Sequence, residues 1–201
     1  MSEPRREAPA VARNRAPILA ALRALLPPDG SVLEIASGSG EHALALSQAM
    51  AGLMIQPSDP SPEARASIDA WSAGHPRIRP AMALDAALPW PSLAVDAVLC
   101  INMIHIAPWA ATLGLLAGST GALRPGGLLY LYGPYRVAGV MVDSNKAFDA
   151  GLRESNPEWG VRDLEAVVAA AAACGFGPPA VTPMPANNLG VVFRLPGRAG
   201  P

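Results

Sequence analysis

The order of apolar and polar positions divides most of the chain into short apolar runs and segments of helical periodicity. Residues 94–101 form the clearest run, nearly continuous in apolar side chains, which is typical of a parallel strand covered on both faces. The other predicted strands lie at 31–36, 53–56, 78–84, 128–132, 181–185 and 190–195. The predicted helices lie at 16–26, 41–51, 62–71, 108–123, 145–153 and 164–174.

Strands that alternate with helices predict an α/β fold with a doubly wound, mostly parallel seven-stranded sheet. The last two strands predict a terminal antiparallel pair. Residues 1–12 hold prolines and mixed charges and are expected to form a flexible leader. Residues 13–201 are expected to fold as a single domain, in which residues 133–160 form a lid-like insertion ahead of the last helix.

Composition narrows the class of protein. Of the 201 residues, 51% are hydrophobic and 15% are charged, as in folded globular proteins. The 15 Lys and Arg residues are balanced by 16 Asp and Glu residues, which argues against a nucleic-acid partner. Two cysteines and three histidines without ligand spacing predict neither a disulfide framework nor a metal site. No segment is typical of a signal peptide or a membrane span, so we expect a soluble, cytoplasmic protein without membrane contact.

The most informative motif is Glu-Ile-Ala-Ser-Gly-Ser-Gly at 34–40, on the turn between the first predicted strand and the next helix. In an open α/β sheet, ligands bind at the carboxyl ends of strands, and glycines there allow close approach of the backbone. Gly38, Gly40 and Ala43 also satisfy the dinucleotide pattern, with Asp59 about 20 residues further on. The glycines alone therefore fit either a dinucleotide or another nucleoside cofactor.

An acidic residue before the glycines favours S-adenosylmethionine (SAM) over a dinucleotide. Glu34 would face a pyrophosphate unfavourably, whereas SAM carries an ammonium and a sulfonium. Asp59 would then accept hydrogen bonds from ribose hydroxyls, and Asp85 would lie near the adenine. Each acid also has a structural alternative, namely local amide contacts for Glu34, an Asx turn before Pro60 for Asp59 and a helix cap for Asp85.

The motif at 34–40 resembles motif I of class I SAM-dependent methyltransferases. Residues 96–101 resemble their fourth strand, and 123–129 the entry to their fifth. From residue 13 onward, the chain resembles more narrowly the methyltransferase-like protein 26 family, formerly catalogued as a domain of unknown function. Shared stretches lie at 13–15 with 17–19, 33–40 with 42–43, 56–60, 102–106 with 108–109, 131–135, 145 with 147–149, 157–163 and 184–188. The resemblance implies a Rossmann-like class I methyltransferase fold with SAM as cofactor and S-adenosylhomocysteine (SAH) as product, but no particular substrate.

Candidate residues follow from these motifs and from the strand ends that border the same cleft. The predicted cofactor-binding residues are Asn14, Glu34, Ser37, Gly38, Gly40, Asp59, Asp85, Asn102 and Met103. The predicted catalytic residues are His105, which would orient or deprotonate an acceptor, and Tyr132. The predicted substrate-binding residues are Arg13, His105, Tyr132, Tyr135, Asp149 and Asn187. For each residue, packing, a turn or a surface ion pair is the structural alternative.

We therefore expect a SAM-dependent methyltransferase that transfers a methyl group in line to a small molecule. A SAM-binding protein without methyl transfer, acting as a partner or scaffold, is the first alternative. An RNA or protein methyltransferase and a nicotinamide-dependent oxidoreductase are the others. Because alignment and exclusion of water carry much of this reaction, a missing catalytic triad does not argue against an enzyme.

Overall fold

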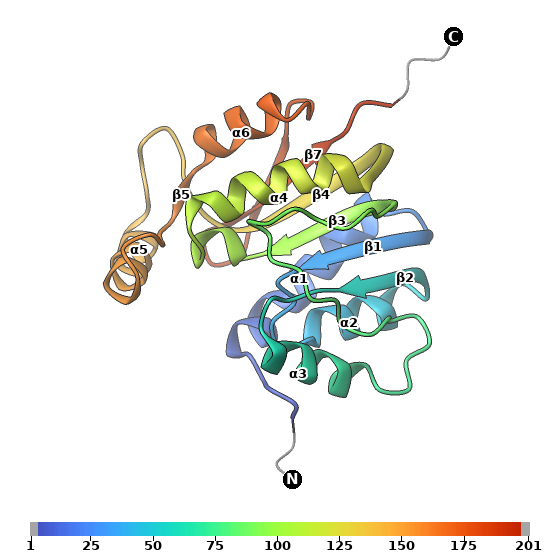
Figure 1. Cartoon of the computed structure of the whole chain (residues 1–201). Coiled ribbons are helices and arrows are strands. Elements are labelled where there is room, and N and C mark those ends of the chain that lie inside the picture. Colours follow the sequence, from blue (N-terminus) through green and yellow to red (C-terminus); the bar gives the residue numbers. More distant parts are fainter. Residues whose placement is uncertain (1–3, 198–201) are drawn as a thin grey trace.

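A computed structural model describes residues 4–197, which form one sheet with helices on both faces (Figure 1). The strand order is β2-β1-β3-β4-β7-β6, and β5 pairs with β4 off this path. The pairs among β2, β1, β3 and β4 are parallel, whereas β7 is antiparallel to both β4 and β6. The strands are β1 (Asp29–Ile35), β2 (Gly52–Pro57), β3 (Val95–Ile101), β4 (Leu123–Arg136), β5 (Arg162–Asp163), β6 (Ala180–Met184) and β7 (Asn188–Arg194).

The predicted seven-stranded, mostly parallel sheet with a terminal antiparallel pair is confirmed, and two hydrophobic cores cover its faces. Side chains alternate along each strand, so Leu33 and Ile35 join one core while Val32 joins the other. The first core packs under α4 and α6, and the second under α1 and α2. The helices are α1 (Pro9–Leu25), α2 (Glu41–Ala49), α3 (Pro62–Ser72), α4 (Trp109–Ala122), α5 (Asp143–Ser155) and α6 (Leu164–Ala173).

The order of the strands fixes where a ligand site can lie. From β1 the chain passes to β2 on one side and later returns to β3 on the other side of β1. The carboxyl ends of β1 and β3 therefore flank the switch point of the sheet, where crossover helices leave room for a ligand. The glycine motif follows β1 at this point, and the 102–109 segment follows β3.

The first helix corrects part of the expectation for residues 1–12. It begins at Pro9 rather than near residue 16, so residues 9–12 belong to the helix and Val11 is buried. Proline suits the first helical positions because their amide hydrogens have no partner within the helix. Pro17, expected in the first turn, lies inside the helix instead. Residues 1–3 lie outside the described part of the chain.

The strand predicted at 78–84 does not form. Only single bridges join Ile78 to Ile55 and Met82 to Ser58. Arg79 donates to the Ile55 carbonyl, but the next amide that donates to β2 is that of Met82 rather than Ala81, and its acceptor Pro57 has no amide hydrogen to donate in return, so the ladder is interrupted between the two bridges. The seventh strand is instead the two-residue β5, which pairs with the end of β4 at Tyr135 and Arg136.

The segment predicted as an insertion holds the helix expected there. β4 continues to Arg136, and α5 follows after a short turn closed by mutual hydrogen bonds of Val137 and Val140. α5 lies at one edge of the molecule, away from the layers that cover the sheet (Figure 1). Among residues 4–197, no helix is both long and apolar enough to cross a membrane.

Candidate functional site

The two glycines after β1 have different tasks. Gly38 adopts a φ of 60°, and a Cβ added to it would come no closer than 4.0 Å to another residue. Gly40 has a φ of 94°, and its added Cβ would lie 2.7 Å from the Cα of Ile68 in α3. Gly40 is therefore required for packing of α2 against α3, whereas Gly38 leaves open space beside the backbone.

Hydrogen bonds join the loops that follow β1 and β2. The Ser37 amide donates to the Ser58 carbonyl (2.8 Å), and the Ser58 amide donates to the Ser37 hydroxyl (3.2 Å). Asp59 is 7% exposed and accepts from the amides of Gly38 and Ser61, each at 3.0 Å. The Asx turn considered for Asp59 is thus present, and the same carboxylate also fixes the glycine loop. Each of its oxygens retains a lone pair for a further donor.

Glu34, the last residue but one of β1, lies beside this loop and has one carboxylate oxygen without a partner. The residue is 3% exposed, and its Oε2 has no hydrogen-bond partner within the described residues. Burial raises the pKa of the Glu34 carboxyl to about 7, with a smaller upward contribution from Asp59 and a downward one from the Ser37 hydroxyl. A buried carboxylate with an unpartnered oxygen is costly to ionise, and a bound cation would lower that cost.

Asn14 reaches the site from α1, where the His42 ring at the start of α2 holds its side chain. The His42 Nε2 and the Asn14 Oδ1 are 2.9 Å apart. Burial lowers the pKa of His42 to about 4, so the ring is neutral at pH 7. Since an amide oxygen only accepts, His42 donates from Nε2, and the amide nitrogen of Asn14 is left to donate elsewhere.

A cavity of about 440 Å³ lies next to Asn14, at the carboxyl ends of β3 and β4. Its walls come from α1, the segment after β3, the end of β4, α5 and the turn between β6 and β7. This volume is in the range of small-molecule sites. The lining residues are Ala10, Arg13, Asn14, Asn102, Ile106, Tyr132, Pro134, Ser144, Asn145, Phe148, Pro185, Ala186 and Asn188.

Four residues predicted from the sequence meet in this cavity, namely Arg13, Asn14, Asn102 and Tyr132. Asn102 has a left-handed backbone (φ 63°), and its amide donates to the Tyr132 carbonyl at 2.8 Å. This bond joins the ends of β3 and β4. Burial raises the pKa of the Tyr132 phenol, and a hydrogen bond with the Asn188 side chain opposes that rise. The phenol is therefore protonated at neutral pH and can donate or accept a hydrogen bond.

Asn188 rather than the predicted Asn187 lines the cavity. Asn187 instead joins the hairpin turn to α5, because its Nδ2 donates to the Ser144 hydroxyl and its carbonyl accepts from Asn145, at 3.1 and 3.0 Å. The sequence pair Asn-Asn signals the turn but not which side chain points inward. Ile106 and Phe148 also line the cavity, and the sequence analysis assigned neither to the site.

His105 and Tyr135 lie outside the cavity. His105 is fully buried, its Nδ1 accepts from the Arg162 amide at 3.4 Å, and its Nε2 has no partner within residues 4–197. Burial, and next the Arg162 charge, lower the pKa of His105 to about 3. Its ring meets that of Tyr135 edge to face, 5.2 Å between centroids, and any side chain on Gly133 would overlap it. The structure thus places a neutral imidazole beneath the backbone of β4.

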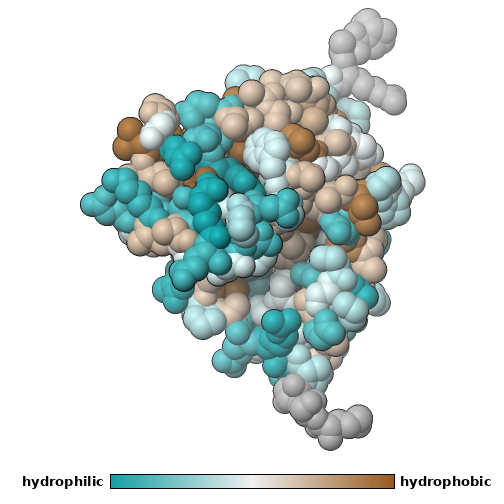
Figure 2. Space-filling view, turned by 60° about the vertical axis from the view of Figure 1, so that its left-hand side comes forward, coloured by the Kyte–Doolittle hydropathy of each residue, from teal (hydrophilic) through white to brown (hydrophobic). Residues whose placement is uncertain are grey.

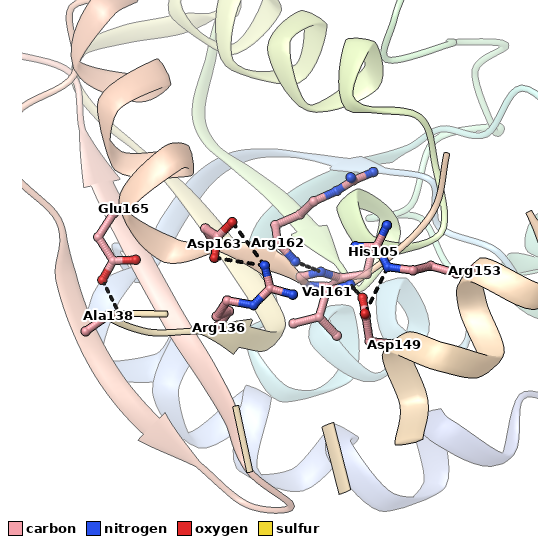
Figure 3. A network of polar contacts seen from close by, with 9 residues as sticks. All are labelled: His105, Arg136, Ala138, Asp149, Arg153, Val161, Arg162, Asp163 and Glu165. Atoms are coloured by element: carbon pink, nitrogen blue, oxygen red, sulfur yellow. Dashed lines mark hydrogen bonds and ion pairs between the residues drawn. The ribbon is translucent and has the colours of Figure 1, made fainter. Parts of the chain in front are cut away.

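Asp149 also lies outside the cavity, within a polar network beside α5 (Figure 3). Its Oδ1 accepts from the Val161 amide at 2.7 Å, and its Oδ2 accepts from Arg153 Nε at 2.9 Å. These donors lower the pKa of the Asp149 carboxyl although burial alone would raise it. Both oxygens are engaged, and the carboxylate fastens α5 to the chain ahead of β5.

Arg162 ties the same region to the segment that follows β3. Its guanidinium donates to the carbonyls of Ile104 (2.8 Å), Ala107 and Glu158 (3.0 Å). Arg136 in turn pairs with Asp163 at 3.3 Å (Figure 3). The network therefore positions the chain on both sides of the cavity-lining residue Ile106.

Two predicted cofactor residues have surroundings that favour a structural task. Met103 is 7% exposed and belongs to the core under α4 and α6. Asp85 is exposed, and its Oδ1 accepts from the Ala87 amide at 2.9 Å, which closes a turn ahead of β3. Residues 81–94 contain no helix, so Asp85 closes a turn rather than the helix cap considered from the sequence.

The architecture is that of SAM-dependent methyltransferases of known structure. An O-methyltransferase family protein from Burkholderia thailandensis matches with a TM-score of 0.81 at 14% identity, over 94% of this chain and 58% of that one. Human N-acetylserotonin methyltransferase in complex with SAM matches with a TM-score of 0.76 at 15% identity, over 93% of this chain and 53% of that one. CalO1, a methyltransferase in calicheamicin biosynthesis with SAH bound, matches with a TM-score of 0.74 at 19% identity, over 91% of this chain and 54% of that one. At these identities the likeness shows the fold, and this chain spans little more than half the length of these proteins.

Residues 5–195 match a protein family of unknown function, DUF938, and the chain belongs to this family. The narrower resemblance to methyltransferase-like protein 26 stays a prediction.

Proposed function

We propose that this protein is a SAM-dependent methyltransferase that acts on a small molecule. The observation that carries the proposal is the buried, unpartnered carboxylate oxygen of Glu34 beside the open glycine loop. A dinucleotide would bring a negative pyrophosphate to this loop, whereas SAM would bring an ammonium and a sulfonium. The methyltransferase fold of the solved neighbours supports the same choice.

The residues around the loop fit SAM. Glu34 would accept from the ammonium, Asp59 from the ribose hydroxyls, and the open backbone at Gly38 would allow close approach. Asn14 retains an amide donor for the methionine part of the cofactor. When bound, SAM supplies a methyl group on a sulfonium that is open to in-line attack.

The cavity beyond Asn14 is the proposed acceptor site, since its volume of about 440 Å³ suits a small molecule. Tyr132 would orient the acceptor through its phenol. We assign His105 a positioning role under β4 rather than that of a base, because its ring is fully buried and its pKa is lowered to about 3. α5 would cover the acceptor as the predicted lid. The family resemblance and the cytoplasmic location expected from the sequence remain part of this proposal.

Calorimetric titration with SAM and SAH tests the cofactor. For wild type we expect binding of both, and for Glu34→Gln a 10- to 100-fold rise in Kd, since a hydrogen bond to a charged group contributes about 1.5–3 kcal/mol. The matched control is Glu158→Gln, because the Glu158 carboxylate is exposed and has no partner within residues 4–197. Folded wild type that binds neither compound, or that binds a nicotinamide dinucleotide instead, would contradict the proposal. Binding without turnover in a broad acceptor screen would favour the scaffold alternative.

A further inference from the structure

The cavity has one charged wall. Among its lining residues only Arg13 carries a charge, and no Asp or Glu faces it. Within residues 4–197 the Arg13 guanidinium has no hydrogen-bond or ion-pair partner. Arg124, Arg136 and Arg153 each pair with an aspartate at 2.9–3.3 Å. An unpaired guanidinium that faces a small-molecule cavity is suited to carboxylate or phosphate, which its planar donors can bind in pairs.

The neighbouring polar groups extend this donor side. Asn14 follows Arg13 in α1 and has its oxygen occupied by His42, so its amide presents hydrogen-bond donors. In α5, the lining residue Asn145 uses its own amide nitrogen to donate to the Asn187 carbonyl at 3.0 Å. The cavity thus has a donor-rich, positively charged end at α1 and neutral groups elsewhere.

The remaining walls are apolar. Ile106 and Phe148 line the cavity although their side chains are 45% and 46% exposed, and Pro134 and Pro185 lie beside them. Figure 2 turns the α5 side of the molecule forward and shows mostly hydrophilic residues there, with apolar ones scattered among them. Half-exposed large apolar side chains at a cavity gain favourable burial when a ligand with an apolar body covers them.

We propose that the methyl acceptor is a small organic anion, with a carboxylate or phosphate on an apolar body, whose anionic group binds Arg13. This inference rests on the proposed methyltransferase function and names its substrate class. The anion lies against α1 and the apolar body against Ile106 and Phe148. Arg13 acts here as a binding residue for the acceptor.

The test uses the full chain and three matched probes, namely phenylacetate, phenyl phosphate and neutral phenylacetamide. Their Kd values are measured by calorimetry with SAH present at saturation and again without it. We expect at least one anion to bind about tenfold more tightly than the amide, as a charge-assisted pair would give. Which anion is preferred separates a carboxylate from a phosphate acceptor. Arg13→Gln should abolish the preference, and Arg13→Lys should restore part of it.

Arg23→Gln is the control, because Arg23 is exposed on the same helix and does not line the cavity. Equal affinity for anions and amide, including no binding of any probe, would overturn the proposal, as would a preference that survives Arg13→Gln. A rise in the Kd of SAH in Arg13→Gln with unchanged anion binding would assign Arg13 to the cofactor and overturn it too. Failure of wild type to bind SAH would refute the proposed function instead, and the titrations without SAH would still decide the role of Arg13.

Discussion

Two acidic residues, almost equally buried, behave in opposite ways. Glu34 near the end of β1 is 3% exposed and Asp149 in α5 is 8% exposed, yet the pKa of Glu34 is raised to about 7 while that of Asp149 is lowered. Asp149 accepts from the Val161 amide and from Arg153, whereas Glu34 Oε2 has no partner within the described chain. At Asp149 the bonded donors outweigh the effect of burial on the pKa, whereas at Glu34 burial outweighs the hydrogen bond from Ser37. Asp149, whose two oxygens both have partners, stabilises the fold. Glu34, which has an unpartnered oxygen, is available to a ligand.

The same contrast separates the two halves of the site. Hydrogen bonds between residues about two dozen positions apart join the loops after β1 and β2, and one oxygen of the Glu34 carboxylate has no partner there. In the α5 region, Asp149 joins α5 to the chain ahead of β5, and Arg162 of β5 reaches the segment after β3. Both oxygens of Asp149 and the guanidinium of Arg162 have hydrogen-bond partners. A ligand-binding role is therefore expected for the first region and a supporting role for the second.

The largest expected effect comes from Asp149→Ala. The change removes the acceptor of the buried Val161 amide and unpairs Arg153, which should lower the free energy of unfolding by about 3 kcal/mol. Urea denaturation measures the loss, with Asp143→Ala as control, since the Asp143 side chain is 96% exposed in the same helix. The Kd of SAH should stay within about twofold of wild type because Asp149 lies outside the cavity. Loss of SAH binding by folded Asp149→Ala would contradict the supporting role of Asp149 and its separation from the ligand-binding role of Glu34.

The second prediction concerns the pH dependence of stability. The pKa of Glu34 is about 7 in the folded protein against a model value of 4.5, so between these pH values the folded state holds a proton that the unfolded state has lost. Stability due to Glu34 therefore falls as pH rises through that window. Asp149 has a lowered pKa, so its stabilisation is present above its ordinary value of 3.8 and is lost in acid below it.

Glu34→Gln measures the contribution of Glu34 to this slope. The variant and wild type should differ little at pH 5, and the variant should gain about 2 kcal/mol relative to wild type at pH 8, because it never carries the buried charge. Urea denaturation at the two pH values gives the comparison. A relative stability that is independent of pH would show that Glu34 is ionised without cost, which requires a partner that the described residues do not provide.

Residues close together in the sequence made one half of the site predictable. Glu34, Gly38 and Asp59 belong to motifs whose spacing reflects the strand–turn–helix unit, and the structure bonds Gly38 to Asp59 as this unit requires. The sheet order followed from the same alternation of strands and helices. One predicted strand did not form, because its register against β2 shifts by one residue opposite Pro57, which cannot donate to a ladder, and hydrophobicity alone does not reveal such a shift.

The cavity was less predictable because five separate segments meet there. Arg13, Asn14, Asn102 and Tyr132 were found, since they lie near strand ends or in the shared stretches. His105 follows the same strand end, but the tight turn after Asn102 carries it beneath Gly133. The partner of Asp149 is a backbone amide 12 residues along the chain, and no side-chain pattern marks such a bond.

The smallest expected effect comes from Arg153→Gln, which tests which partner of Asp149 matters most. Arg153→Gln removes an ion pair at 2.9 Å whose arginine side chain is 47% exposed, so it should cost at most about 1 kcal/mol. The Val161 amide still donates to the carboxylate in this variant, and the lost charge is partly replaced by solvent. Urea denaturation of Arg153→Gln, Asp149→Ala and the double variant gives the coupling between the two side chains. If Arg153→Gln cost as much as Asp149→Ala, the Arg153 guanidinium rather than the Val161 amide would be what distinguishes Asp149 from Glu34. A cation beside Glu34 would then be enough to give that residue the lowered pKa of Asp149.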